Sequence, residues 1–211
     1  DHLCLTNIEV LTMTPRGGRH ITVWLSEKGH RWLTELIEAA DRFYPGGTGM
    51  RRLVANGWIT LRAVRPYERF TVDDMEIYSV ESNHRGNGED EFALNYVMKK
   101  PDGILFYVAD SGLYSESNLD VLAGTGADTL VMEGTAGSCP ADRTSGHLNA
   151  GHFIENVNAF AERGVIKPDA SVYVTHINQV NDFNHAEYQA YMTEHCRYNV
   201  TIAHDGMKIE P

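Results

Sequence analysis

Residues 106–113 read FYVADSGL, and this stretch decides how the rest of the chain is interpreted. A short apolar run, Ile104 to Ala109, ends abruptly at Asp110, and Ser111-Gly112 follows. The pattern predicts a buried β-strand that presents one carboxylate at its C-terminal end, with a tight turn beyond it. The two oxygens of such a carboxylate can each bind a different metal ion. An isolated aspartate at this position would more often cap the next helix, expected near Glu116.

Asp110 is accompanied by imidazole groups elsewhere in the chain. His84 lies upstream, His147 and His176 lie downstream, and the chain opens on Asp1-His2. Imidazoles and carboxylates at the ends of successive strands are the groups that form zinc, manganese or iron sites. The sequence therefore predicts a metal site at one edge of a sheet.

Composition places the chain among ordinary soluble globular proteins. Hydrophobic residues make up 42% and charged residues 22% of the 211 residues, which can bury a substantial core. The net charge of −11 argues against non-specific binding of nucleic acid, but it leaves a small phosphorylated substrate possible if metal offsets the charge. Cys4, Cys139 and Cys196 form no CxxC pair, which favours a reducing compartment. We find no signal peptide and no apolar run long enough to cross a membrane, so we expect a cytoplasmic protein.

The beginning of the chain is unusual. It has no initiator methionine and starts directly on Asp1-His2-Leu3. We therefore expect the sequence to be cropped from a longer one.

Periodicity predicts an α/β protein in which an antiparallel block precedes alternating strands and helices. Ser26 is expected to cap a helix that continues to about Asp41, with Trp32, Leu33, Leu36 and Ile37 facing the core. The predicted strands are 20–24, a meander of 58–64, 70–72 and 75–80, a hairpin of 92–98 and 104–109, and then 129–132, 171–175, 200–203 and 207–209. The later predicted helices are 116–122, 149–163 and 184–194.

Six blocks of the sequence, spread over residues 1–209, resemble the metallo-β-lactamase-fold hydrolases. Within them the chain most resembles the group that contains the cyclic-phosphate phosphodiesterase of bacterial phosphonate breakdown, with ribonuclease Z a more distant relative. The blocks are Asp1-His2, His84 before the hairpin with Ala93-Leu94-Asn95-Tyr96, Ala109-Asp110-Ser111-Gly112, Gly146-His147-Leu148-Asn149, Val174-Thr175-His176 and the stretch HDGMKI at 204–209.

This resemblance implies a single domain over residues 1–211, an αββα sandwich that lacks its N-terminal strands in the chain given. Asp1-His2 matches the end of the family's His-x-His-x-Asp-His motif, so the resemblance implies a chain that is truncated inside that motif. The resemblance implies two divalent ions, zinc or manganese. Their ligands in this chain would be Asp1, His2, His84, Asp110 and His176, with Asp110 bridging the pair.

The mechanism implied is attack of a metal-bound hydroxide on a phosphodiester. Asp1 and His147 are the predicted catalytic residues. His147 is the candidate general acid for the leaving alkoxide, because an imidazole titrates near neutral pH. It could instead cap the following helix or bind the first metal. Glu133, at the end of the strand before the His147 loop, could orient a ligand histidine.

The predicted function is hydrolysis of a small cyclic phosphate or nucleotide-like diester. Two alternatives stay open: hydrolysis of a lactone, thioester or β-lactam on the same metals, and a non-catalytic domain with a vestigial site. The expected partner is a small-molecule phosphodiester, with no membrane and no nucleic acid, and a homodimer is left open.

Overall fold

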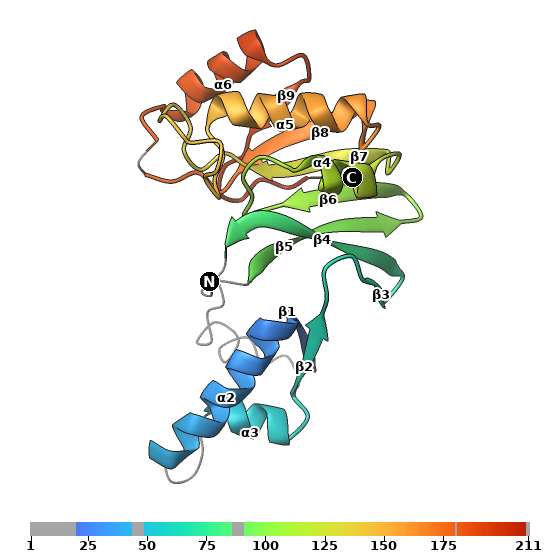
Figure 1. Cartoon of the computed structure of the whole chain (residues 1–211), viewed down its shortest axis with the longest axis vertical. Coiled ribbons are helices and arrows are strands. Elements are labelled where there is room, and N and C mark those ends of the chain that lie inside the picture. Colours follow the sequence, from blue (N-terminus) through green and yellow to red (C-terminus); the bar gives the residue numbers. More distant parts are fainter. Residues whose placement is uncertain (1–19, 44–48, 86–90, 180, 210–211) are drawn as a thin grey trace. The chain divides into compact units, whose positions relative to one another are not determined.

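The computed structural model describes residues 20–43, 49–85, 91–179 and 181–209. The chain divides into two compact units, Asp1–Arg65 and Pro66–Pro211, and each is described by itself. Figure 1 traces both units. The prediction of one domain over the whole chain stays a prediction.

The described part of the first unit is a pair of parallel strands with two helices. Its elements are β1 (Ile21–Ser26), α2 (Glu27–Phe43), α3 (Gly49–Ala55) and β2 (Ile59–Val64). The hydroxyl of Ser26 accepts a hydrogen bond from the Gly29 amide (2.9 Å), which is the expected helix cap. Because β2 pairs with β1 and not with β3, the predicted three-stranded meander is wrong.

The predicted core face of α2 is only partly correct. Leu33 is fully buried, but Trp32 is 52% exposed and Leu36 is 38% exposed. The helical spacing is correct, but of these apolar side chains only Leu33 belongs to the buried core. The sequence also did not predict the short helix α3.

The second unit is built on a seven-stranded sheet in the order β3-β4-β5-β6-β7-β8-β9. The first four strands pair antiparallel, whereas β6, β7, β8 and β9 run parallel. Their bounds are β3 (Arg69–Val72), β4 (Met75–Arg85), β5 (Phe92–Lys100), β6 (Gly103–Val108), β7 (Ala127–Glu133), β8 (Ile166–Thr175) and β9 (Val200–Ile202). Residues 207–209 form no strand, contrary to the prediction.

Three capped helices connect the parallel strands. They are α4 (Glu116–Leu122), α5 (Ala150–Glu162) and α6 (His185–His195), and Ser115, Asn149 and Asn184 cap their N-termini through side-chain oxygens. The predicted inner face of α5, formed by Phe153, Val157 and Phe160, is fully buried. Figure 1 shows α5 running alongside β8.

The strand directions bring the candidate residues to one edge of this sheet. Strand β4 runs antiparallel to β5, and β5 runs antiparallel to β6, so β4 points the same way as β6, β7 and β8. His84, Asp110, Glu133 and His176 lie at or just past the C-terminal ends of these four strands. In open α/β sheets this is the edge at which ligands bind.

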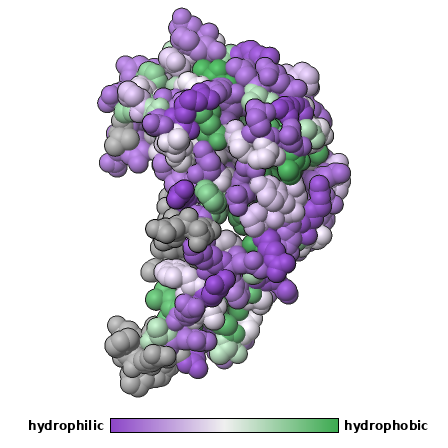
Figure 2. Space-filling model, in the orientation of Figure 1, coloured by the Kyte–Doolittle hydropathy of each residue, from purple (hydrophilic) through white to green (hydrophobic). Residues whose placement is uncertain are grey.

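The surface is largely polar. On the face shown in Figure 2, hydrophilic residues predominate and hydrophobic residues form small separate patches. Among the described residues, no helix has both the length and the apolar character needed to cross a bilayer.

Candidate metal centre

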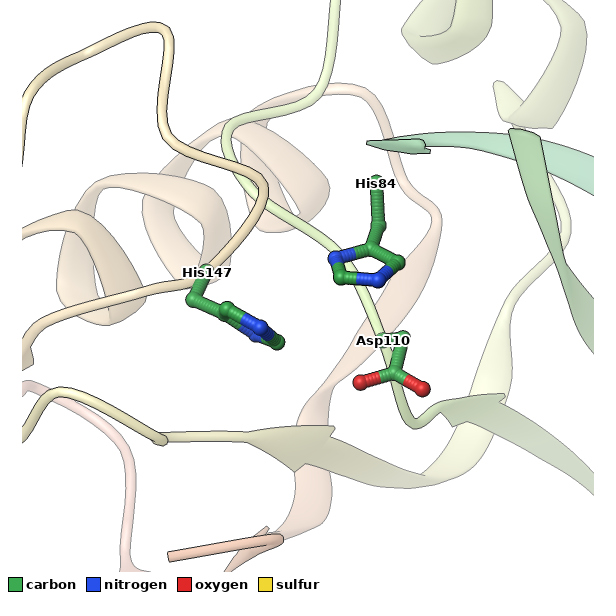
Figure 3. A group of neighbouring side chains, drawn as sticks. All are labelled: His84, Asp110 and His147. Atoms are coloured by element: carbon green, nitrogen blue, oxygen red, sulfur yellow. The ribbon is translucent and has the colours of Figure 1, made fainter. Parts of the chain in front are cut away.

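Three side chains, two from strand ends and one from the loop before α5, converge on one point. His84, Asp110 and His147 each offer a ligand atom, and these atoms all lie within 4.8 Å of one another. Figure 3 shows the two imidazoles and the carboxylate turned toward a common space. His84 (9% exposed) and Asp110 (8% exposed) form the buried floor of the group. This spacing suits a shared ion.

His176 joins the group through Asp110. Its Nε2 atom lies 3.0 Å from Oδ1 of Asp110, and its ring stacks with that of His147 at a centroid distance of 6.1 Å. The side chains of His147 and His176 are about one-third exposed, at 34% and 33%. The centre thus has a buried floor and an accessible rim, which is what a site for a small molecule requires.

Local irregularities in the chain orient His84. The register between β4 and β5 shifts between Glu81 and Arg85, and such a bulge redirects side chains at a strand end. The Nδ1 atom of His84 lies 3.1 Å from the carbonyl oxygen of Gly146. Because a carbonyl only accepts, neutral His84 donates from Nδ1 and carries its lone pair on Nε2. That is the tautomer a metal ligand needs.

Close backbone packing holds the turn after Asp110. The Gly112 amide donates to the side-chain oxygen of Asn83. A Cβ atom on Gly112 would lie 2.0 Å from the carbonyl oxygen of Ser145, so no other residue fits there without movement of the loop. These close contacts therefore fix the relative positions of three segments: the strand end that carries His84, the Asp110 turn and the loop before His147.

Glu133 is a buried carboxylate that connects the segments around the centre. Its side chain is fully buried, and its Oε1 atom accepts from the Ser111 amide (3.0 Å) and lies 2.9 Å from Nδ1 of His147. Its Oε2 atom accepts from the amides of Thr135 (3.0 Å) and Leu148 (3.2 Å). The carboxylate therefore holds His147 with Nδ1–H toward Glu133 and Nε2 on the opposite side of the ring.

The structure brings together four of the residues that the sequence singled out: His84, Asp110, His147 and His176. Their roles as ligands or catalysts stay predictions. Asp1 and His2 lie outside the described residues. Thr135 and Asn83, which support the group, were missed, because a lone threonine or asparagine in a loop gives no signal in a single sequence.

The donor set fits a transition-metal ion. Imidazole nitrogen and carboxylate oxygen are the usual ligands of zinc and manganese. The hydrogen bonds behind the two imidazoles also fit, because the Nδ1 atom of His84 contacts a carbonyl oxygen and that of His147 a carboxylate, which leaves Nε2 toward the ion. The residues present can therefore hold a divalent ion.

No family model matches the sequence, and no curated protein matches it either. Solved structures do match. YhfI of Bacillus subtilis, a metallo-β-lactamase fold protein, is 14% identical with a TM-score of 0.66, covering 97% of this chain and 71% of its own. Unliganded yeast PDE1 is 15% identical with a TM-score of 0.66, covering 96% of this chain and 63% of its own. Zn²⁺-bound PqqB of Methylobacterium extorquens is 14% identical with a TM-score of 0.60, covering 98% and 69%.

These similarities show that the chain has the metallo-β-lactamase fold, as predicted. The chain spans between 63% and 71% of the length of these three proteins.

Proposed function

We propose that this chain carries the metal centre of a metal-dependent hydrolase that cleaves a small phosphodiester, either a cyclic phosphate or a nucleotide-like diester. One observation carries the proposal. The ligand atoms of His84, Asp110 and His147 lie within 4.8 Å of one another, at the strand-end edge of a metallo-β-lactamase fold. His176 lies against the same aspartate.

His84, Asp110 and His176 would hold two divalent ions, together with Asp1 and His2, which lie outside the described residues. Zinc is the first ion to test, because the similar PqqB structure contains Zn²⁺, and manganese is the second. Such ions, when bound, supply a water activated for attack at neutral pH and stabilise the charge on phosphoryl oxygens.

The Glu133–His147 pair is arranged to donate a proton to an oxygen leaving group. Glu133 accepts the Nδ1–H of His147 and orients the ring, so the imidazolium form of His147 is the proton donor and gives its proton from Nε2. The His147 side chain is 34% exposed, which allows a substrate oxygen to reach it. A departing alkoxide needs that proton far more than a thiolate does, which favours a phosphodiester over a thioester.

The first experiment measures substrate class. The metal-loaded protein, with any residues that precede Asp1 in its natural form, is assayed on bis(p-nitrophenyl) phosphate and on a lactone panel. We expect turnover of the diester and little turnover of lactones. Lactone turnover without diester turnover would move the function to the alternative hydrolases. A folded protein that binds no transition metal would indicate a vestigial site.

The second experiment tests His147. Replacing it by alanine should slow cleavage of a diester with a poor alkoxide leaving group by about 10²-fold or more, and should slow release of p-nitrophenolate much less. His195→Ala is the matched control, because His195 is exposed on α6 and its Nδ1 atom contacts only the backbone oxygen of Tyr191 among the hydrogen bonds observed.

Metal content decides between the two roles of His147. If His147→Ala loses metal and both diesters slow equally, His147 is a ligand. Unchanged turnover of both diesters would exclude the proton-donor role.

A further inference from the structure

Thr135, two residues beyond the end of β7, connects the loop that follows β7 with the loop that follows β8. Its amide donates to Oε2 of Glu133 (3.0 Å), and its carbonyl accepts from the Asn178 amide (3.2 Å). Its hydroxyl donates to the carbonyl oxygen of His176 (2.9 Å). Thr135 is 6% exposed, so these bonds form away from water.

The bond to His176 falls where the backbone needs support. His176 has φ of 53°, in the left-handed region that residues with a β-carbon rarely occupy. The turn comes directly after β8, where the Gly134 amide makes a β7–β8 bond to Thr175. Beyond this point the sheet no longer dictates the path of the chain. Conformations of this kind persist only when their surroundings enforce them, and they cluster at functional sites.

The left-handed turn decides where the imidazole points. With the backbone in this conformation, Nε2 of His176 lies 3.0 Å from Oδ1 of Asp110. If φ returned to the β region, the direction of the Cα–Cβ bond would change and the ring would leave the carboxylate. The Thr135 hydroxyl binds the carbonyl of the turn itself, so it acts on this conformation directly.

We propose that Thr135 is a positioning residue of the metal centre: its hydroxyl holds the strained backbone of His176 and so places the imidazole beside Asp110. The inference rests on the proposed metal-dependent function. Through Glu133, Thr135 also connects this side of the centre to the loop that carries His147. This positioning role requires no contact between Thr135 and a substrate.

The test compares metal affinity in threonine variants of the full chain. Thr135→Val removes the hydroxyl at nearly constant volume, and Thr135→Ser keeps it. Thr125→Val is the matched control, since the Thr125 hydroxyl also donates to a backbone carbonyl, that of Leu122 (2.6 Å), at the opposite end of β7. Co²⁺ is the probe, because its visible absorption reports the ligand geometry.

We expect Thr135→Val to bind Co²⁺ about tenfold more weakly and with an altered spectrum. Thr135→Ser and Thr125→Val should stay within about twofold of the wild type, which is a small effect on this scale. Equal affinity in Thr135→Val and Thr125→Val would overturn the positioning role and leave the proposed function intact. A wild type that binds no Co²⁺ would overturn both.

Folding is checked separately. If Thr135→Val does not fold, Thr135→Ala is compared with Thr125→Ala in the same titration. If neither Thr135 variant folds while both Thr125 variants do, the hydroxyl supports the whole fold rather than the centre. That result also overturns the proposal.

Discussion

Strand β7 carries an acidic residue near each end, and the two carboxylates have different surroundings. Asp128, at the start, is 34% exposed and pairs with the Lys167 ammonium. Glu133, at the end, is fully buried and holds Ser111, Thr135, His147 and Leu148. Both accept backbone amides, but water can replace the partners of Asp128, whereas the Ser111, Thr135 and Leu148 amides that donate to Glu133 belong to buried residues. Burial, more than the number of bonds, decides how much each carboxylate contributes.

The largest effect is expected from Glu133→Gln. The amide end of glutamine would face donors that the carboxylate now satisfies, and three of these donors are backbone amides of the buried residues Ser111, Thr135 and Leu148. We expect a loss of about 3 kcal/mol in the free energy of unfolding. Urea denaturation of the metal-free protein measures it, so that any loss of metal does not contribute. A loss below about 1 kcal/mol would mean that the loops rearrange and that Glu133 does not hold the segments around the centre together.

The second effect in size is the change in melting temperature when metal is bound or removed. An ion that binds only the folded state at 100 times its dissociation constant adds about 2.7 kcal/mol of stability. We therefore expect Zn²⁺ or Mn²⁺ to raise the melting temperature of the wild type and of Asp128→Asn, and a chelator to reverse the rise. Asp110→Asn should lose this response, because it removes a central ligand charge. If Asp110→Asn responds to the ion as strongly as the wild type, the ion binds elsewhere.

The next variant examines another edge of the sheet, where a side chain makes the hydrogen bonds that a neighbouring strand would make. The amide of Gln189 on α6 donates to the Val200 carbonyl (2.7 Å) and accepts from the Ile202 amide (3.0 Å), so it covers the outer edge of β9. Gln189→Ala should cost about 1–2 kcal/mol. It should also increase self-association, since exposed strand edges pair with one another.

Sedimentation velocity and urea denaturation measure the two effects of Gln189→Ala. Glu194→Ala is the control, because Glu194 is exposed on the same helix. Unchanged association would show that α6 shields the β9 edge without the Gln189 amide.

The smallest effect is expected from Asp128→Asn, about 0.5 kcal/mol after allowance for solvent screening. The hydrogen bond from Lys167, followed by that from the Ile104 amide, lowers the pKa of Asp128 below its usual value of 3.8. A lowered pKa means that the contribution is complete above the unfolded-state pKa. It disappears as the pH falls through the folded-state pKa.

The stability difference between wild type and Asp128→Asn should therefore vanish in acid and shrink with added salt. Urea denaturation at pH 7 and near pH 3, at low and high salt, measures both trends. A difference as large as that of Glu133→Gln would contradict the comparison.

Much of the second unit could be predicted because its elements carry strong local signals. The helix over residues 116–122 was predicted with the observed bounds, and the Asp102-Gly103 turn marked the hairpin of β5 and β6 correctly. The first unit was harder. Trp32 and Leu36 match a helical core pattern, but a pattern cannot say which of its apolar side chains the rest of the fold will cover.

The candidate site, too, could be predicted only in part from the sequence. His84, Asp110, His147 and His176 were each named from the sequence, since they are chemically distinctive and lie at strand ends or in a loop beyond one. Their supports were not all foreseen. Thr135 is an ordinary loop residue until the fold places its hydroxyl against the carbonyl of His176.

Local sequence alone determined the alternation of strands and helices and the kinds of ligand atoms available, because these depend on neighbours within a few residues. Only the tertiary structure decided that residues 26 to 92 positions apart meet at one point, that Glu133 is sealed from water, and that His176 adopts a left-handed turn. The reason is physical: distance in space, access of water and backbone strain are set by contacts between segments that are remote along the chain.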